Sequence, residues 1–233
     1  LGQTYAAYRS FENAIDEFKE TIRLIPIYPE AYIELGNAYL GVRDVGAARK
    51  AFDDAIASDA DYFPPVLSLA ALDVRDKQID KASLALEGLL LRDRKNANAM
   101  RLMSLISEKR KDLLPAIDWL SKAMEIELDI KNGLHLVELY LAANRMQEAQ
   151  YFVATVRTTF PKDPRPMAAE AGIALRNDNL GKARGIYEGM QRQAKEQQSV
   201  PGLLNVAGLQ HSMGDVNAAR ITLAYASNIN PSN

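Results

Sequence analysis

Apolar residues recur along this chain with the period of an α-helix and fall into blocks of two helices. Within residues 35–55, Leu35 and Tyr39 share a face of one helix, and Ala48 and Phe52 share a face of the next. A short break separates the two helices. The apolar and polar alternation typical of strands does not appear over any length, so the pattern predicts an all-α fold.

The small residue at the centre of this block recurs at a nearly constant interval. The gaps are 34, 34, 34, 33, 34 and 36 residues between successive members of the series Ala14, Ala48, Ala82, Ala116, Ala149, Ala183 and Ala219. A period of about 34 residues with two amphipathic helices per unit is typical of helical-repeat solenoids. With these alanines and with Leu35, Gly36 and Tyr39, the chain resembles the tetratricopeptide-repeat (TPR) family over essentially its whole length.

The resemblance implies a right-handed α-solenoid of about seven helix pairs, the first of them truncated. We expect a single array over residues 1–233, cut from a longer chain. Its units are predicted at residues 1–28, 29–62, 63–96, 97–129, 130–163, 164–199 and 200–233. Three prolines within residues 160–166 predict either a bend or an ordinary loop between units.

Several positions depart from the regular pattern. Asp73 and Ser107 stand where the family has a large aromatic or apolar residue, which predicts a looser or more curved stretch. Trp119, the only tryptophan, is expected to pack at the edge of the core. The stripe Gly181, Gly185 and Gly189 predicts either close approach of a neighbouring backbone or an irregular helix. The final apolar face has no capping helix after it in this sequence, which predicts self-association through an uncapped end.

Composition narrows the functional classes. The 233 residues are 48% hydrophobic and 25% charged, and the formal net charge is −2, so no overall basic field favours nucleic acid. No apolar run approaches the roughly 20 residues of a membrane-spanning helix. The chain has no cysteine, which excludes disulfides and thiolate metal sites.

The sequence offers no catalytic or metal-binding motif. The two histidines, His135 and His211, lie more than two units apart, and no His-Glu-x-x-His run or glycine-rich phosphate loop is present. Pairs such as Asp53-Asp54 stand beside basic residues on helix surfaces. We therefore expect no enzyme activity, no cofactor and no metal.

A stacked helix-pair array presents a long concave surface, and the resemblance implies that the first helix of each pair lines it. Carried over by position, the predicted groove residues are Ile33, Asn37, Leu40, Leu67, Val74, Arg75, Arg101, Leu105, Glu108, Leu134, Glu138, Leu141, Leu175, Arg176, Leu204 and His211. Ala71, Gly172 and Gly208 belong to the same row. For each leucine, packing between helices is the alternative to contact with a ligand.

Two TPR subclasses do not fit. Binders of chaperone tails use a lysine one turn before an asparagine, but Ile33 precedes Asn37 here. Eukaryotic glycosyltransferase arms carry an inward ladder of asparagines. The corresponding row here reads Glu34, Ser68, Leu102, His135, Ala169 and Asn205.

The resulting hypothesis is a protein-binding scaffold whose groove holds a partner segment with apolar and acidic residues, oriented by Arg75, Arg101 and Arg176. The degenerate repeats, with helices rich in alanine and leucine, are similar to those of bacterial TPR proteins, in particular lipoproteins of exopolysaccharide and surface-sorting systems. That similarity favours the periplasm over the cytoplasm. The alternative is a regulatory or substrate-recruiting arm of a larger enzyme.

Overall fold

The computed structural model describes residue 3 and residues 10–229, and within them every regular element is an α-helix. Thirteen α-helices follow one another and no strand is present in this part of the chain. The predicted all-α repeat fold is therefore confirmed. The first helix of the first predicted unit, with Leu1, Gly2 and Tyr5, lies outside the described residues. The chain divides into two compact parts, each larger than one predicted repeat, which are called unit 1 (Leu1–Ile126) and unit 2 (Glu127–Asn233) from here on.

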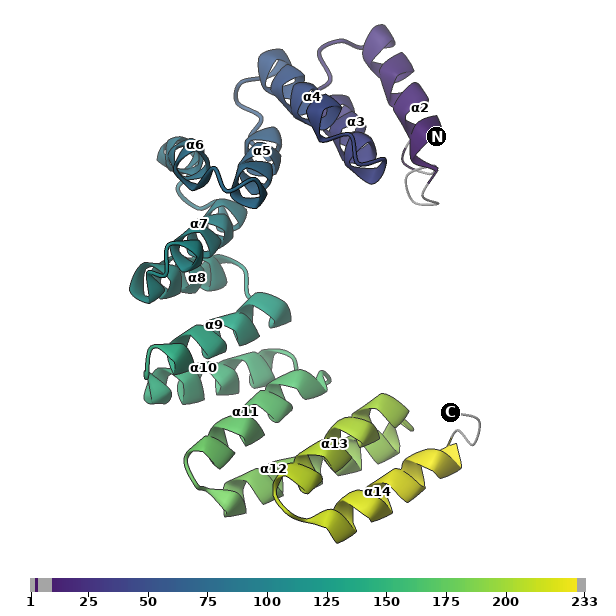
Figure 1. Ribbon diagram of the computed structural model, residues 1–233, viewed down its shortest axis with the longest axis vertical. Coiled ribbons are helices and arrows are strands. Elements are labelled where there is room, and N and C mark those ends of the chain that lie inside the picture. Colours follow the sequence, from purple (N-terminus) through teal and green to yellow (C-terminus); the bar gives the residue numbers. More distant parts are fainter. Residues whose placement is uncertain (1–2, 4–9, 230–233) are drawn as a thin grey trace. The chain divides into compact units, whose positions relative to one another are not determined.

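Unit 1 is a succession of helices in which each packs against the next (Figure 1). The helices are α2 (Phe11–Leu24), α3 (Pro29–Gly41), α4 (Val45–Ser58), α5 (Pro64–Arg75), α6 (Ile79–Arg92), α7 (Ala97–Lys109) and α8 (Leu113–Ile126). In addition, α5 contacts α7, so first helices of successive pairs lie side by side.

Unit 2 repeats this arrangement. Its helices are α9 (Ile130–Ala142), α10 (Met146–Thr159), α11 (Pro164–Arg176), α12 (Leu180–Glu196), α13 (Val200–Ser212) and α14 (Val216–Ile229). Here α9 contacts α11 as well as α10. Proline at the start of α3, α5, α11 and α13 removes an amide that would have no helical partner, so it is tolerated there.

The recurring alanines form the seams between helices. All seven are buried, because only a methyl group fits where two helix backbones approach. Gly36 serves the same purpose on α3: a Cβ built there would lie 2.4 Å from Cε1 of Phe52. The Phe52 ring therefore packs directly on the α3 backbone.

The polar departures are buried and bonded. Asp73 on α5 is paired with Arg49 of α4 at 2.6 Å and with Lys81 of α6 at 3.2 Å. Ser107 Oγ donates to the carbonyl of Met103 at 2.9 Å. Each polar group thus has a partner that offsets its burial, so the packing at these two positions is not loose. The alternative expectation, a more curved stretch, stays a prediction.

Unit 2 contains a similar three-helix ion cluster. Glu170 of α11 is buried, and its carboxylate lies 2.9 Å from Arg157 of α10 and 3.1 Å from Lys182 of α12. Like Asp73, this carboxylate joins three successive helices.

The glycine stripe of α12 follows neither expectation. α12 is a regular helix of 17 residues. A Cβ at Gly185 would meet nothing within 4 Å, and at Gly189 it would meet only the flexible end of Met167. No neighbouring backbone therefore approaches the described stripe at those two positions. Trp119 packs against the core cluster around Leu86 and Met103, as expected for a packing residue.

Candidate functional site

The predicted groove residues of α3 lie partly in the core. Ile33 and Leu40 are half-buried and pack against a cluster formed by Ala48, Phe52 and Leu72, while Asn37 is exposed between them. Most of the apolar area of these two side chains is therefore used within the protein. The polar amide of Asn37 is what α3 offers to a partner on this side.

On α5 one predicted groove residue is wrong. Val74 is 7% exposed and belongs to the core cluster with Ala70, Ala82 and Leu86. One turn of helix carries about 3.6 residues, so the position beside Arg75 turns inward while Arg75 itself stays exposed. Leu67 is half-buried against the same cluster.

The α7 side chains present the best mixture of charge and apolar surface in unit 1. Leu105 is 37% exposed, and Arg101 and Glu108 are half-buried. Arg101 Nη1 donates to Asn98 Oδ1 at 2.8 Å, which fixes the guanidinium along the helix surface. An exposed leucine one turn from an arginine suits a segment with apolar and acidic groups.

In unit 2 the α9 leucines, Leu134 and Leu141, are half-buried against the cluster of Val137 and Val153. Glu138 is exposed, with its Oε2 3.4 Å from Nδ1 of His135. These residues again combine packing with a polar surface.

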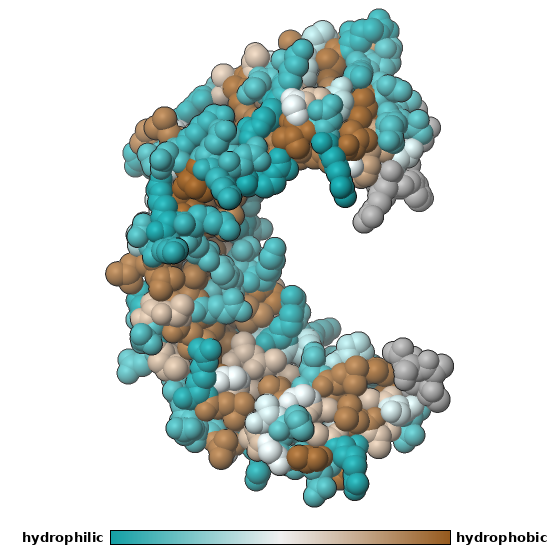
Figure 2. Space-filling model, viewed as in Figure 1, coloured by the Kyte–Doolittle hydropathy of each residue, from teal (hydrophilic) through white to brown (hydrophobic). Residues whose placement is uncertain are grey.

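The α11 and α13 residues leave more open surface. Arg176, Leu204 and His211 are exposed, and Leu175 is half-buried. A Cβ at Gly172 on α11 or at Gly208 on α13 would meet nothing within 4 Å. Both helix backbones are therefore accessible at the same position of the repeat. Figure 2 shows the mixed character of the visible surface, with hydrophobic residues interspersed among hydrophilic ones in both units.

The three arginines of the predicted groove differ in the ion pairs that they already form within the protein. Arg75 Nε donates to Asp76 Oδ1 at 3.2 Å, and Asp76 also accepts from Arg49 at 2.7 Å. The hydrogen bond from Arg49, then that from Arg75, holds the pKa of Asp76 below its ordinary value. Arg176 forms no ion pair with the described residues, so its charge remains available to a partner.

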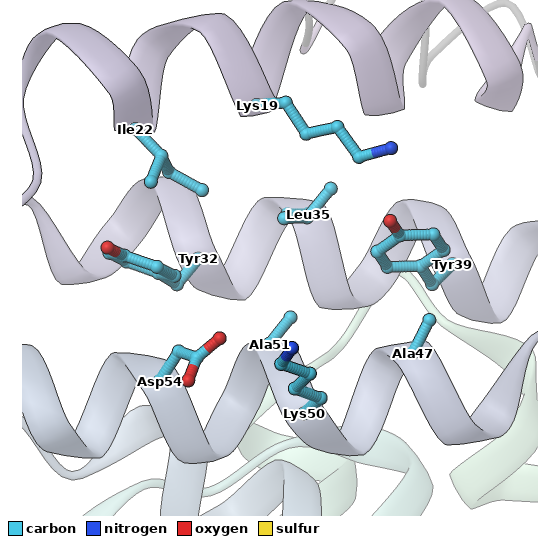
Figure 3. Close-up of a pocket in the computed structure, with 9 residues that line it drawn as sticks. All are labelled: Lys19, Ile22, Tyr32, Leu35, Tyr39, Ala47, Lys50, Ala51 and Asp54. Carbon is cyan, nitrogen blue, oxygen red and sulfur yellow. The ribbon is translucent and has the colours of Figure 1, made fainter.

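A pocket that the sequence reading missed lies between α2, α3 and α4 of unit 1, away from the groove positions Ile33 and Asn37. It encloses about 260 Å³. Figure 3 shows Tyr32 and Tyr39 on either side of Leu35 along α3. Its full lining is Lys19, Ile22, Tyr32, Leu35, Tyr39, Ala47, Lys50, Ala51 and Asp54. We call it the tyrosine pocket.

A second pocket lies one repeat further along, between α4, α5 and α6, and encloses about 330 Å³. Seven positions of its lining are positions of the tyrosine pocket shifted by 34 residues: Asp53, Ile56, Val66, Leu69, Asp73, Lys81 and Ala85. We call it the aspartate pocket, after Asp73. The sequence carried a signal for both pockets, because Ala51 and Ala85 are small residues at the position of the repeat that Trp119 occupies next. The Trp119 ring packs against the core there.

Nothing in the described part of the chain resembles a metal site, since no group of three histidine, aspartate or glutamate side chains converges there. In the same residues no helix has both the length and the apolar composition that crossing a membrane requires. His135 and His211 lie on α9 and α13, two helix pairs apart along the chain.

Comparison with known proteins identifies the fold. No family model matches the sequence, and no curated protein matches it. Among solved structures, the C-terminal part of a TPR repeat-containing protein from Cytophaga hutchinsonii is 13% identical, with 100% of this chain and 95% of that chain covered and a TM-score of 0.72. PilF of Pseudomonas aeruginosa is 14% identical over 85% of this chain and 94% of its own, with a TM-score of 0.67.

A third structure is YrrB, described as a TPR protein with an unusual peptide-binding site. It is 16% identical, with 78% of this chain and 93% of YrrB covered and a TM-score of 0.55. At these identities the similarity establishes the fold. The chain therefore has the fold of tetratricopeptide-repeat proteins, an α-solenoid built from stacked helix pairs.

Proposed function

We propose that this chain is a protein-binding scaffold whose first helices hold a segment of a partner protein. The observation that carries the proposal is that first helices in both unit 1 and unit 2 carry exposed leucine side chains and exposed or half-buried arginine side chains. In unit 1 these are Leu105 and Arg101 on α7, and in unit 2 they are Leu204 on α13 and Arg176 on α11. Stacked helix pairs offer such surfaces as extended binding sites.

The partner segment is proposed to be apolar and acidic. A leucine that is half-exposed gains by covering its remaining apolar area, at about 25 cal/mol per Å². A carboxylate beside Arg101 or Arg176 gains a charge-assisted hydrogen bond in the planar geometry that guanidinium groups favour. At Gly172 and Gly208 the partner backbone can approach the helix without meeting a side chain.

A narrower proposal places the scaffold in the bacterial envelope, in a secretion system for exopolysaccharide. It rests on the degenerate repeats and their helices rich in alanine and leucine. PilF and the Cytophaga hutchinsonii protein are bacterial proteins of the same fold. The alternative is a recruiting arm of a larger enzyme. Fractionation of cells that carry the complete gene separates the two: a periplasmic protein without a catalytic domain supports the scaffold, and a catalytic domain on the same chain supports the arm.

The binding proposal is tested with peptides selected from a phage-displayed random library against the chain. Selected peptides are expected to be rich in apolar and acidic residues. The variant Arg101→Glu tests unit 1 and Arg176→Glu tests unit 2, each by fluorescence anisotropy with the peptides selected on the unchanged chain. We expect the dissociation constant of a peptide bound at either surface to rise about tenfold or more, equivalent to about 1.4 kcal/mol.

The matched controls are Arg184→Glu and Arg220→Glu, which make the same charge change at exposed positions of the second helices α12 and α14. These controls should leave binding unchanged, and circular dichroism should show equal helicity for all four variants. Equal affinity of the selected peptides for Arg101→Glu, Arg176→Glu and the unchanged chain would reject the assignment of the surface.

A further inference from the structure

The tyrosine pocket has the size of a site for one side chain. Its volume of about 260 Å³ lies below the range of about 300–1,000 Å³ that is usual for pockets that enclose a whole small molecule. Its floor is apolar, made by Leu35 of α3, Ile22 of α2 and Ala51 of α4. One inserted apolar side chain would cover this floor.

Two tyrosine rings flank that floor. Tyr32 and Tyr39 stand two helical turns apart on α3, on either side of Leu35 (Figure 3). The Tyr32 hydroxyl donates to the carbonyl of Pro26 at 3.1 Å, which holds its ring in place. Because aromatic rings attract one another edge to face, an aromatic side chain is the occupant that the pair favours.

The rim carries the ammonium groups of two lysines. Lys19 of α2 lies with its Nζ 5.7 Å from the Tyr39 ring centroid, and Lys50 extends from α4 on the opposite side. Among the described residues, neither lysine forms an ion pair and the Tyr39 hydroxyl forms no hydrogen bond. With Asp54 as the one lining carboxylate, the pocket has a formal excess of positive charge.

In the aspartate pocket, which is the equivalent site one repeat later, the cationic side chains are paired with carboxylates of the protein. Arg49 and Lys81 there are paired with Asp73, and Asp53 supplies a second carboxylate. Its charges are balanced within the protein: two positive and two negative groups line it. The two lysines, which form no ion pair with the described residues, are thus a property of the tyrosine pocket and do not follow from the repeat itself.

We propose that the tyrosine pocket is a second docking site, distinct from the first-helix surface, which takes one aromatic side chain of an acidic peptide segment. The aromatic ring enters between Tyr32 and Tyr39 and covers Leu35. The flanking carboxylates of the segment pair with Lys19 and Lys50, and the Tyr39 hydroxyl donates to one of them. Aromatic anchors in a small pocket with a charged rim are a common arrangement at protein interfaces.

The probe is a fluorescein-labelled peptide with a central phenylalanine between two acidic residues on each side. Anisotropy titration of the chain should give a dissociation constant of about 10–100 µM. A peptide with alanine in place of phenylalanine should bind at least tenfold more weakly, and so should one with lysines in place of the acids. If the first peptide does not bind at millimolar concentrations of the protein, the proposal is overturned.

The decisive variant is Ala51→Trp, which puts a bulky ring into the lining of the tyrosine pocket at the position equivalent to Trp119, whose ring packs against the core cluster of its own repeat. Its matched control is Ala85→Trp, which fills the aspartate pocket. Ala51→Trp should weaken probe binding at least tenfold and Ala85→Trp should leave it unchanged. Equal binding to both variants and to the unchanged chain would place the peptide elsewhere and reject the site.

Charge reversal gives a second route that does not depend on packing. The double variant Lys19→Glu and Lys50→Glu changes two exposed side chains and should abolish probe binding while circular dichroism stays the same. Arg101→Glu and Arg176→Glu should not affect binding of this probe, so the test of the tyrosine pocket is independent of the test of the first-helix surface. If sedimentation shows that Ala51→Trp instead abolishes self-association, and the probe does not bind, the occupant is a second copy and the peptide proposal is wrong.

Discussion

Arg49 on α4 and Asp73 on α5 join two successive helix pairs through a contact of 2.6 Å between Nη1 and Oδ1. The Asp73 side chain is 3% exposed and that of Arg49 24%, so the pair is largely removed from water. Lys81 of α6 also reaches this carboxylate, and Arg49 reaches Asp76. The position that holds Tyr39 one repeat earlier holds Asp73 here, whose carboxylate forms an ionic tie between α4, α5 and α6.

We predict that Arg49→Ala destabilises unit 1. The change leaves Asp73 buried with only Lys81 as a cationic partner, and an under-satisfied buried charge costs about 1–3 kcal/mol. Urea denaturation followed by circular dichroism measures the loss. Arg94→Ala, at an exposed position, is the control and should stay within about 0.5 kcal/mol of the unchanged chain. Equal stability of the two variants would show that the tie contributes nothing.

Asp76 gives the folded chain a pH dependence of defined sign. Its hydrogen bonds from Arg49 and Arg75 lower its pKa from the ordinary value of 3.8. The stability that this carboxylate contributes is therefore complete above pH 3.8 and is lost as the pH falls through the lower pKa of the folded state. We expect Asp76→Asn to be less stable than the unchanged chain at pH 7 and to approach it in acid.

The measurement is the urea midpoint of both proteins at several pH values from neutral to strongly acidic. Asp16→Asn, which removes an exposed carboxylate of α2, serves as the comparison and should follow the unchanged chain throughout. A difference for Asp76→Asn that stays constant into the acid range would contradict the linkage.

Gly36 and Gly88 predict opposite effects for the same substitution. A Cβ at Gly36 would lie 2.4 Å from Phe52, whereas one at Gly88 on α6 would meet nothing within 4 Å. Gly36→Ala should destabilise by about 1–3 kcal/mol because the ring must shift. Gly88→Ala should stabilise by about 0.5–1 kcal/mol because alanine favours the helix. Thermal unfolding of the two variants checks both, and effects of the same sign would refute the packing account.

Thr222 of α14 is the centre of a buried polar chain in unit 2. Its Oγ1 accepts from Gln191 Nε2 at 2.6 Å and lies 2.8 Å from Gln210 Oε1, to which it donates. Thr222→Val keeps the shape and removes both bonds, which should cost about 1–3 kcal/mol. Thr158→Val on α10 is the matched control, because Thr158 is exposed and bonds only locally. Chemical denaturation should separate the two variants, and a neutral Thr222→Val would mean that the chain of bonds adds no net stability.

The sequence alone determined the helical fold and the positions that hold its helices together. Helix periodicity and the spacing of the small residues from Ala14 to Ala219 are local properties, because they depend on which residues share a face within a few turns. Comparison with the TPR pattern that the chain resembles marked the Asp73 and Ser107 positions as unusual. It failed at Val74, where one step around the helix separates the surface from the core.

Tertiary structure decided what those positions do. Asp73 became a bonded core residue because Arg49 and Lys81 reach it from helices on either side. The tyrosine pocket exists because Ala51 of one helix stands opposite side chains of two others. Pockets and ion ties depend on distances between helices, and the hydrophobic pattern of a single helix contains no information about those distances.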